Sequence, residues 1–448
     1  MKNIRLAYLF LLLALSLLWL LADDFSSALQ AFRALQLSMI NFTGILAIGC
    51  MSAGMLLAMR PARVEPFLGG LDKTYRLHKW LGISALVLAI VHWLWVKLPN
   101  WLADLGWMRK PLRKPASSPA ETLSGVAHFL TTQHGLAKSI GEWAFYATVV
   151  LALAALLKNF PYRHFFKTHR LMAVVYPALG FHAIVLMKPN YWRAAIGPVV
   201  GLLVLAATLA AAVSLLRRVG HTRRAVGVIE SLVHYRDMRV LSVVIRLRDR
   251  WFGHAAGQFA FVTFDAAEGA HPFTISSSWH DDGKLRFHIK GIGDYTEKLP
   301  DTLKHGGLVT VEGPYGAFDF RGDKPTQIWI AGGIGITPFL ARMQARARDL
   351  HEPDAHAVDL FYSTNAYDEA FVGAMRQLAT RANVRLHVLV SGKDVRLTAA
   401  RLCEIVPAWT SADVWFCGPA AFGRALRQDL VALGLAQADF HQELFEMR

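Results

Sequence analysis

The 448-residue chain is predicted to fold as a membrane-embedded all-α bundle of six helices, followed by a soluble antiparallel β-barrel and an α/β Rossmann-like domain. Hydrophobic residues make up 54% of the chain, more than an ordinary soluble protein carries, and the longest apolar runs all lie in the first half. After Arg218 the sequence changes to short alternating strands and amphipathic helices, which is typical of a soluble α/β chain. We therefore expect three domains, at residues 1–218, 219–322 and 323–448.

Six apolar runs are long enough to cross a hydrocarbon core, which takes about 20 residues of helix. Lys2 and Arg5 precede the first run, as in a signal peptide, but no small-residue cleavage site follows it, so we expect an uncleaved span. The six runs lie at residues 6–22, 36–59, 77–97, 141–157, 168–187 and 194–216.

Lysine and arginine near the ends of these runs predict the orientation in the membrane. With six spans, most of these basic residues fall on one side together with the soluble half, and that side should be the cytosol. The segment 98–140 disagrees, because it is basic and lies on the predicted outer side. Since long loops cross membranes with less regard to charge, we keep this topology. We expect a multi-pass protein of a bacterial inner membrane or a plasma membrane.

The net charge of +15 invites a nucleic-acid interpretation. Many basic residues adjoin the ends of apolar runs, however, where topology and anionic lipid headgroups account for them. We therefore expect membrane lipid, and no nucleic acid, as a partner. The three cysteines, Cys50, Cys403 and Cys417, lack the spacing of disulfides or zinc sites, which fits a reduced cytosolic compartment for the C-terminal half.

Four histidines lie inside the third and fifth apolar runs. Ionisable side chains within a span are costly, so each is a candidate functional residue. The two histidines of each run are 14 and 13 residues apart, which is about 21 and about 19.5 Å along a helix axis. Two parallel helices thus present histidines at two matching depths, His78 with His169 near the cytosolic face and His92 with His182 near the outer face.

Two bis-histidine haems stacked across the membrane would use all four side chains. Neutral imidazole is a good ligand for haem iron, and facing helices supply one ligand from each side of the macrocycle. The alternative is that the histidines are packing or helix-end residues. On a straight helix His169 and His182 would lie about 140° apart, so we expect a kink near Pro177 or Gly180 to bring them to one face.

The soluble half carries two short motifs after its first strands. The segment His271-Pro272-Phe273-Thr274 is followed by a strand at 284–290, which runs into Gly291-Ile292-Gly293-Asp294-Tyr295-Thr296. The glycines allow close backbone approach, and a helix expected to begin near Thr296 would offer free amides to an anion. The alternative is that this Gly-x-Gly sequence forms a structural turn and binds no ligand. The earlier barrel strands are expected at residues 225–234, 239–247 and 257–264.

A third glycine motif marks the last domain. The strand 327–331 runs into Gly332-Gly333-Ile334-Gly335-Ile336-Thr337-Pro338, and an amphipathic helix is expected at 339–350. Strand, glycine turn and helix in this order bring backbone amides to a dinucleotide phosphate at a sheet edge. Two later motifs complete the domain: residues 414–419, which contain Cys417, and residues 440–445, which end in Phe445.

In this order the motifs resemble those of the ferredoxin–NADP reductase superfamily. With the six-span histidine domain, they resemble the ferric reductase and NADPH oxidase family. The resemblance implies FAD, two b-type haems and NADPH or NADH as cofactors. It implies that Thr274 lies nearest the point of hydride arrival, that Lys290 supplies charge for a pyrophosphate, that Cys417 faces the nicotinamide, and that Phe445 stacks on the flavin. For Cys417 the alternative is an inert buried thiol.

The implied site residues fall into three groups. The catalytic group comprises Thr274, Cys417 and Phe445. The metal ligands are His78, His92, His169 and His182. The cofactor-binding group comprises His271, Pro272, Phe273, Thr274, His288, Lys290, Gly291, Gly293, Thr296, Gly332, Gly333, Gly335, Thr337, Pro338, Gly418 and Pro419.

The resemblance implies hydride transfer from cytosolic NAD(P)H to FAD, followed by single-electron transfer to an outer-side acceptor, ferric iron or dioxygen. Superoxide-forming members carry a further histidine one turn beyond the outer ligand, where Val96 stands here, and this favours a metal or another acceptor. The alternative is an electron-conduit subunit feeding a quinone or a periplasmic redox protein through the basic segment 98–140.

The choice between NADPH and NADH stays open at this level. NADPH-selective relatives often place an arginine where Thr364-Asn365 stands. Arg381, Lys393 and Arg396 are the basic residues that would have to reach this position from elsewhere.

Overall fold

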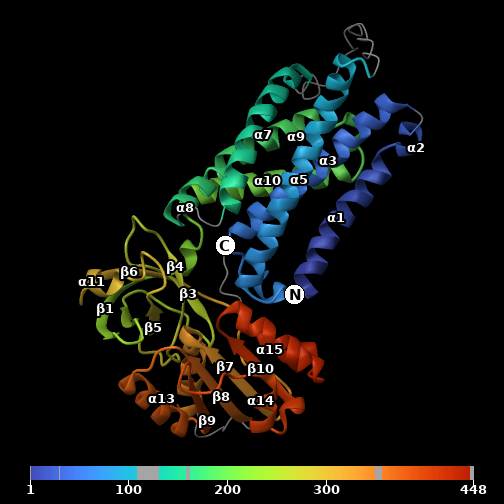
Figure 1. Ribbon diagram of the computed structural model, residues 1–448. Helices are drawn as coiled ribbons and strands as arrows, with labels where there is room; N and C mark the ends of the chain where they lie inside the picture. The colour runs from blue at the N-terminus through green and yellow to red at the C-terminus, as the bar shows by residue number, and fades with distance from the viewer. Residues whose placement is uncertain (1, 30, 108–130, 158–161, 349–355, 444–448) are drawn as a thin grey trace. The chain divides into compact units, whose positions relative to one another are not determined.

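The computed structural model describes residues 2–29, 31–107, 131–157, 162–348 and 356–443. The chain forms two compact units, residues 1–68 with 73–219, and residues 69–72 with 220–447 (Figure 1). The first unit is helical, and the second contains both sheets. The predicted order of an all-α bundle, a β-sheet domain and an α/β domain is confirmed.

Among the described residues of the first unit, six helices are long and apolar enough to cross a membrane, as predicted. The candidate spans are Asn3–Ala22, Phe32–Ala58, Leu71–Asp104, His134–Leu156, Phe165–Leu186 and Ile196–Leu215. The corresponding helices are α1 (Lys2–Ala22), α3 (Phe32–Ala58), α5 (Leu71–Asp104), α7 (His134–Leu156), α8 (Tyr162–Arg170) with α9 (Met172–Leu186), and α10 (Ile196–Leu215); the shorter elements are α2 (Phe25–Ala28), α4 (Glu65–Leu68) and η1 (Pro189–Trp192).

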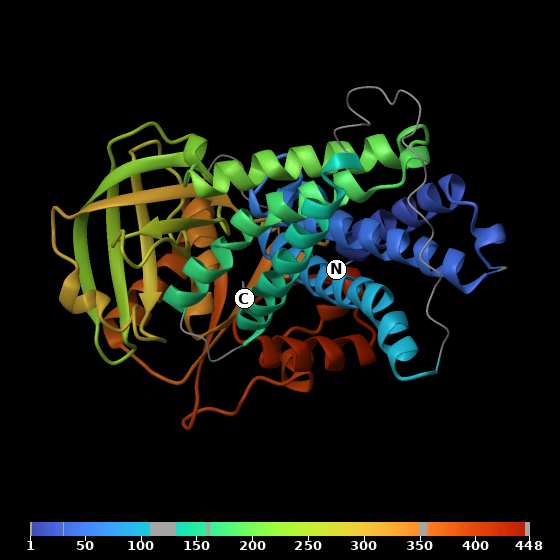
Figure 2. The ribbon, with the colours of Figure 1, turned by 90° about the horizontal axis from the view of Figure 1, so that it is seen from above.

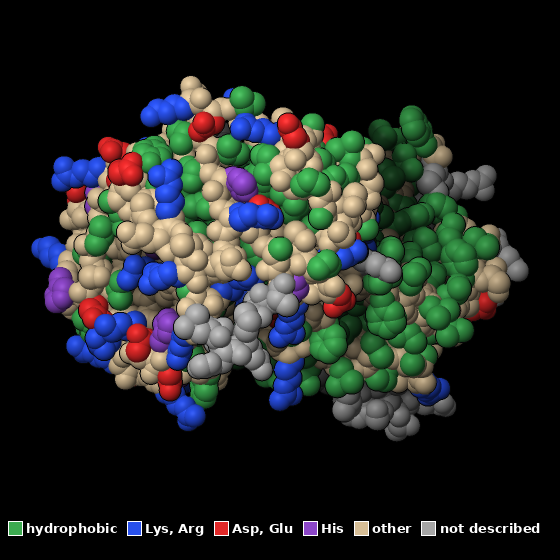
Figure 3. All heavy atoms as spheres, turned by 90° about the horizontal axis from the view of Figure 1, so that it is seen from below, with side chains coloured by type: hydrophobic (Ala, Val, Ile, Leu, Met, Phe, Trp, Pro, Cys, Tyr) green, Lys and Arg blue, Asp and Glu red, His purple; other side chains and the backbone are tan. Residues whose placement is uncertain are grey.

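The outer surface of the helical unit is apolar. On α1, Phe10 is 75% exposed and Leu21 is 76% exposed, although both are large hydrophobic residues. Hydrophobic side chains gather densely over part of the face in Figure 3, whereas charged side chains are scattered over the rest. A helix with an exposed apolar surface is suited to lipid rather than to water.

The fifth span contains a turn that was not predicted. Helix α8 ends at Arg170 and α9 begins at Met172, so the break falls at Leu171. The Leu171 amide bonds Thr168 O, and the Val174 amide bonds Leu171 O, which is the tighter three-residue pattern of a 3-10 turn. Pro177 lies inside the continuous α9. The turn therefore lies between His169 and His182, and the expected kink near Pro177 or Gly180 stays a prediction.

Among the described residues, the first sheet of the second unit has six antiparallel strands in the order β4-β3-β6-β1-β2-β5. In Figure 2 its strands appear mainly as yellow-green arrows that form a curved layer. An isolated bridge between Ile275 and Phe287 joins the segment after β4 to β5, which brings the two edge strands together as in a barrel. The core inside this sheet contains Val243, Phe287 and Val311. The strands are β1 (Arg224–Tyr235), β2 (Val240–Leu247), β3 (Phe259–Thr263), β4 (His271–Thr274), β5 (Lys284–Lys290) and β6 (Leu308–Tyr315); the short elements are η2 (His221–Arg223) and α11 (Leu299–Thr302).

The second sheet is parallel, with the strand order β11-β10-β7-β8-β9. Every residue of β7 is buried, as expected for a central strand covered on both faces. Trp329 packs with α12 and α13 on one face, and Ile330 packs with α14 and α15 on the other. The strands are β7 (Thr326–Gly332), β8 (Ala357–Thr364), β9 (Val384–Val390), β10 (Ala412–Cys417) and β11 (Phe440–Gln442); the helices are η3 (Gly333–Ile336), α12 (Thr337–Arg348), α13 (Glu369–Arg381), α14 (Ala399–Ile405), η4 (Trp409–Ser411), α15 (Ala420–Ala432) and η5 (Gln437–Asp439).

Candidate functional sites

The helical unit brings its four predicted histidines together in two pairs. The ring centroids of His78 and His169 are 5.9 Å apart, and those of His92 and His182 are 6.2 Å apart. In each pair the ring planes are inclined by 81°. Two imidazoles that bind one metal from opposite sides, at about 2 Å per metal–nitrogen bond, would have a similar centroid separation.

Backbone carbonyls orient three of the four imidazoles. Nδ1 of His78 lies 2.8 Å from the carbonyl oxygen of Gly54, and Nδ1 of His92 lies 2.9 Å from that of Ile40. Nδ1 of His182 lies 2.8 Å from the carbonyl oxygen of Ala137. Since a carbonyl accepts only, each Nδ1 carries the proton and Nε2 keeps its lone pair. This is the tautomer that a metal ligand needs.

His169 is held differently. Its Nδ1 is buried and has no hydrogen-bond partner among the described residues. Its ring instead stacks on Phe165 one turn earlier in α8, with centroids 5.3 Å apart and planes inclined by 11°. Aromatic packing thus fixes the ring orientation here, in place of a hydrogen bond.

Two glycines make room for the histidines of the second pair. A Cβ on Gly141 of α7 would lie 1.9 Å from Nδ1 of His182, and a Cβ on Gly44 of α3 would lie 3.1 Å from the His92 ring. The first distance is impossible for a real side chain, so His182 can reach the α7 backbone only because residue 141 is glycine.

The donor set favours a metal that takes two protein ligands. Within the described residues, no group of three or more His, Cys, Asp or Glu side chains is placed to hold a metal ion. Structural zinc normally takes four protein ligands and catalytic zinc three. A haem iron bound by one imidazole on each side fits the paired arrangement.

In the β-sheet domain, the predicted His-Pro-Phe-Thr motif forms β4. Thr274 is buried and pairs with Phe259, while His271 stacks on Tyr295 with ring centroids 4.4 Å apart. Burial lowers the pKa of His271, although the nearby Glu268 opposes the shift. Burial, followed by repulsion from Asp265 and Glu268, raises the pKa of Tyr295 to about 12. Both rings are therefore neutral near pH 7.

The aromatic side chain of Tyr295 was not predicted as a site residue. Its hydroxyl is buried without a hydrogen-bond partner among the described residues, so a polar ligand group is a natural complement. The sequence carried one signal for it, because Tyr295 stands directly before Thr296 in the second glycine motif.

The second glycine motif differs from its prediction in one respect. The helix expected near Thr296 begins only at Leu299 and is four residues long. The Thr296 hydroxyl accepts hydrogen bonds from the amides of Ile292 and Gly293, at 3.1 and 3.2 Å. These amides are therefore held by Thr296 within the turn, and a helix N-terminus does not supply the anion site.

Positive charge at this site comes from Lys290 on β5. Its ammonium lies 3.7 Å from the position that a Cβ would take on Gly333, so Lys290 reaches from the barrel to the glycine turn of the α/β domain. Burial, and then repulsion from Arg239, lowers the pKa of Lys290. Gly291 packs against Glu297, and Gly293 is exposed. Lys290 thus marks where the two nucleotide motifs meet.

His288 lies two residues before Lys290 and is buried. Its Nδ1 lies 2.7 Å from the Ser276 hydroxyl, and its ring contacts Phe371 edge-on at 5.6 Å. Burial, and secondarily the charge of Arg286, lowers the pKa of His288 to about 3. The imidazole is therefore neutral over the physiological range.

The third glycine motif lies at the switch point of the parallel sheet. The strand order places β8 on one side of β7 and β10 on the other, and ligands of such sheets bind outside the carboxyl ends of the strands at this point. There Gly335 approaches β10 so closely that a Cβ would lie 2.1 Å from the Cys417 carbonyl oxygen. Gly333 adopts a left-handed φ of 56°. The other predicted residues at this edge are Gly332, Thr337, Pro338, Gly418 and Pro419, and a Cβ on Gly332 would lie 2.6 Å from Pro419 Cδ.

Cys417 ends β10 and is fully buried. Burial, and then repulsion from Glu443, raises the pKa of its thiol well above the ordinary value. Cys417 is therefore a protonated thiol at neutral pH and not a nucleophilic thiolate. Phe445, the third predicted catalytic residue, lies outside the described residues.

The basic residues considered for nucleotide choice lie at different places. Arg381 ends α13, which leads into the amino end of β9. Lys393 follows the carboxyl end of β9, and its ammonium lies 5.9 Å from the centre of the Tyr367 ring. Arg396 is exposed in the segment before α14. Lys393 is thus at the same sheet edge as the glycine turn, and Arg381 is not.

Comparison with known proteins bears on both halves of the chain. Residues 43–180 match the family model described as "Ferric reductase like transmembrane component", and residues 226–319 match the one described as "FAD-binding domain". The chain joins a ferric reductase-like transmembrane domain to an FAD-binding reductase module. Among the described residues, six helices are long and apolar enough to cross a membrane, which agrees with the first of these two matches.

Similar proteins of known annotation match the soluble half. The carnitine monooxygenase reductase subunit of Escherichia coli (strain K12) is 32% identical over 182 residues, covering 39% of this chain and 53% of the relative. The CDP-6-deoxy-L-threo-D-glycero-4-hexulose-3-dehydrase reductase of Yersinia pestis is 24% identical over 201 residues, covering 43% of this chain and 60% of the relative. This chain therefore spans between 53% and 60% of the length of these two relatives.

Solved structures resemble the same half. The FAD/NAD-binding domain of a nitric oxide dioxygenase from Vibrio cholerae aligns with a TM-score of 0.43 and 21% identity, covering 49% of this chain and 98% of that domain. A ferredoxin reductase in carbazole 1,9a-dioxygenase aligns with a TM-score of 0.43 and 18% identity, covering 50% of this chain and 69% of that chain.

The close approach of Gly335 to β10 yields a first prediction. In Gly335→Ala the new methyl group would collide with the Cys417 carbonyl, so the turn must move away from the sheet edge. We expect the dissociation constants of NADP⁺ and NAD⁺ to rise at least tenfold, about 1.4 kcal/mol, in titrations of the FAD-loaded protein. Gly373→Ala on α13, where a Cβ would meet no described atom within 4 Å, is the matched control. Unchanged affinity in Gly335→Ala would contradict the assignment.

The neutral, buried His288 yields a second prediction, on stability against pH. Between pH 3 and pH 6.5 the unfolded state binds a proton on this residue and the folded state does not, so stability rises with pH in this window. At pH 5 the loss is up to about 2 kcal/mol relative to pH 7. We therefore expect the thermal unfolding temperature, followed by flavin fluorescence, to fall less steeply with decreasing pH in His288→Gln than in the wild type. Equal pH slopes would refute this account.

Proposed function

We propose that this protein carries electrons from NAD(P)H, through FAD and two bis-histidine b-type haems, to an acceptor on the outer side of a membrane. The observation that carries the proposal is the pair of facing imidazoles at each of two levels, 5.9 and 6.2 Å apart. Three of the four rings donate Nδ1–H to a carbonyl and keep Nε2 for a metal. Bound haem supplies reversible one-electron chemistry, and flavin links it to a two-electron hydride donor.

In the soluble unit, the chain contributes position and charge. His271 and Tyr295, stacked and neutral, form an aromatic wall beside β4, on which we place the flavin ring next to Thr274. Lys290 would neutralise pyrophosphate where the barrel meets the glycine turn. The protonated Cys417 thiol would face the nicotinamide without attacking it, because the thiolate is the nucleophilic form.

We place the soluble unit in the cytosol, in a bacterial inner membrane or plasma membrane protein. The support is the excess of lysine and arginine near the span ends on the same side as residue 218. This orientation puts His78 and His169 at the inner level and His92 and His182 at the outer level.

We propose ferric iron, rather than dioxygen, as the acceptor. Val96 lies one turn beyond His92 on α5, where superoxide-forming members carry a further histidine. The alternative of a conduit subunit feeding a quinone or a periplasmic redox protein depends on the basic segment 98–140, of which residues 108–130 lie outside the described residues.

For the nucleotide we propose a preference for NADPH. Thr364 at the end of β8 is not acidic, and its hydroxyl donates to the Ala366 carbonyl at 2.8 Å, so no carboxylate at this position would repel a 2′-phosphate. Lys393, at the same sheet edge, supplies a cation. An uncharged Thr364 together with the cation Lys393 fits a phosphorylated ribose better than a ribose diol.

A visible spectrum with haem counting tests the proposal. The wild type should hold two b-type haems per chain, both reduced anaerobically by NADPH. His78→Leu should lose the inner haem, keep NADPH-dependent FAD reduction, and lose transfer to the outer side, because the proposed electron path runs through the inner haem. His134→Leu, at the exposed start of α7, is the matched control and should keep both haems. Haem-free wild-type protein, or unimpaired transfer in His78→Leu, would refute the proposal.

The contact between Gly141 and His182 gives a separate prediction for the outer level. Gly141→Ala should displace His182 from the α7 backbone and lower haem content from two to about one per chain, since a Cβ would lie 1.9 Å from the ring. Gly135→Ala in the same helix, where a Cβ would meet no described atom within 4 Å, should leave haem content unchanged. Pyridine haemochrome assay of both purified variants measures the difference, and equal haem content would argue against outer ligation by His182.

A further inference from the structure

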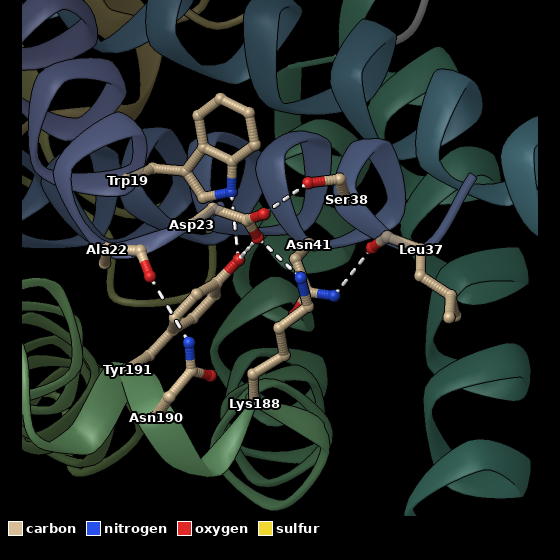
Figure 4. Close-up of polar contacts among 9 residues, drawn as sticks. All are labelled: Trp19, Ala22, Asp23, Leu37, Ser38, Asn41, Lys188, Asn190 and Tyr191. Carbon is tan, nitrogen blue, oxygen red and sulfur yellow. Dashed lines mark hydrogen bonds and ion pairs between the residues drawn. The ribbon is translucent and has the colours of Figure 1, made fainter. Parts of the chain in front are cut away.

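A buried polar cluster lies at the end of the bundle where α1 finishes (Figure 4). Its centre is the Asp23 carboxylate, whose side chain is 3% exposed. Oδ1 accepts a hydrogen bond of 2.6 Å from the Ser38 hydroxyl, and Oδ2 accepts from the Lys188 ammonium at 2.5 Å and from the Tyr191 hydroxyl. Trp19 Nε1 donates to the Tyr191 oxygen at 3.1 Å. The carboxylate thus joins α1, α3 and the segment after α9.

The polar cluster keeps the Asp23 carboxylate charged, although burial by itself favours the neutral, protonated form. Burial tends to raise the pKa of Asp23, but hydrogen bonds from Lys188, Ser38 and Tyr191, with the charge of Lys188, bring it below the ordinary value. The carboxylate is therefore ionised and fully engaged. Removing a partner of Asp23 is costly, because the Asp23 side chain is buried and its charge would be less compensated, whereas the Lys188 side chain is 31% exposed.

One branch of the cluster leads to His92. Ser38 lies on α3 two residues before Ile40, and the Ile40 carbonyl accepts the hydrogen bond from Nδ1 of His92. A second bond, from Gln36 Nε2 to the Trp95 carbonyl at 2.8 Å, fixes the same turn of α3 to α5 just beyond His92. The position of the Ile40 carbonyl is thus tied to Asp23 through Ser38.

The other branch leads to His182. Helix α9 carries His182 and ends at Leu186, and Lys188 and Tyr191 follow directly. Both bind the same Asp23 oxygen, so they anchor the carboxyl end of α9 to α1. In addition, Asn190 donates to the Ala22 carbonyl at 3.3 Å. One carboxylate therefore links the two elements that hold the two rings of this pair.

The other histidine pair is out of reach of this cluster. The Gly54 carbonyl, which accepts from His78, is on α3 sixteen residues beyond Ser38, or about 24 Å along a helix axis. His169 lies on α8, on the far side of the Leu171 break. The cluster can influence one level without the other.

We propose that Asp23 is a positioning residue for the outer histidine pair, setting the spacing and charge environment of His92 and His182 through Ser38 and Lys188. This inference rests on the proposed haem function and adds to it a residue that binds no cofactor itself. Its loss should alter one haem selectively. Because Asp23→Asn leaves the Lys188 charge uncompensated, the outer haem should become easier to reduce.

Potentiometric titration of the full-length, haem-loaded protein in detergent tests this. In Asp23→Asn we expect the redox equilibrium of one haem to shift about tenfold towards the reduced form, about 59 mV for a one-electron couple, while the other haem stays unchanged. The shift should persist in the His78→Leu background, which keeps the outer haem, and be absent in His92→Leu, which keeps the inner one. Asp23→Glu should restore most of the wild-type value.

Two further variants keep the test decisive. Asp24→Asn removes the neighbouring exposed carboxylate, which accepts from Ser26 at 2.9 Å, and should leave both potentials unchanged. Ser38→Ala removes only the hydrogen bond from α3 to Asp23. It should alter the electron paramagnetic resonance signal of the low-spin ferric outer haem, and this can be measured even if Asp23→Asn does not fold. Equal shifts in both haems, no shift, or the same shift in Asp24→Asn would overturn the inference. A wild type without two haems would overturn the proposed function itself.

Discussion

Hydrogen bonds from buried imidazoles to backbone carbonyls constrain the helical unit, and three of its four paired histidines make one. Helix backbones normally use their carbonyls internally, yet Gly54, Ile40 and Ala137 each offer a carbonyl to a histidine on a neighbouring helix. Such contacts require close packing of helices. The small residues at or beside them are a direct consequence, and Gly141 is the clearest case. The ring nitrogen that faces the partner histidine is thereby left without a proton.

In the soluble unit the main constraint is the close approach of one backbone segment to another at the ends of two parallel strands. In the parallel sheet β7 lies between β8 and β10, and the glycine turn after β7 can approach the end of β10 because a Cβ on Gly335 would lie 2.1 Å from the Cys417 carbonyl oxygen. Charge is supplied from the other sheet, by Lys290. The proposed nucleotide site therefore draws on residues of both sheets in this unit.

Hydrophobic patterning predicted most of the architecture. The six spans, the antiparallel strands and the Gly-Gly-x-Gly turn follow from run length, alternation and turn chemistry, all of which are local properties. The pairing of His78 with His169 followed from counting residues along helices. Contacts between helices could not be predicted in this way, since an acceptor such as Ile40 carries no mark in the sequence. The Asp23 cluster was missed for the same reason: its members come from three elements.

One local prediction was wrong for an identifiable reason, and another stays a prediction. A kink near Pro177 or Gly180 stays a prediction because Pro177 lies inside α9, and the tight turn at Leu171 was not predicted. A helix was expected at Thr296, but its hydroxyl binds the preceding amides and forms a closed turn instead. Side-chain competition for backbone groups decides such boundaries.

The break at Leu171 has a mechanical meaning for the whole bundle. A single continuous helix would behave as a rod, so that any displacement at one end would be felt by both histidines of the fifth span. With the rod divided, α8 can adapt to substitutions around Phe165 and His169 while α9 keeps its grip on Tyr191 and α1. Natural variation and engineering can therefore tune the two levels one at a time.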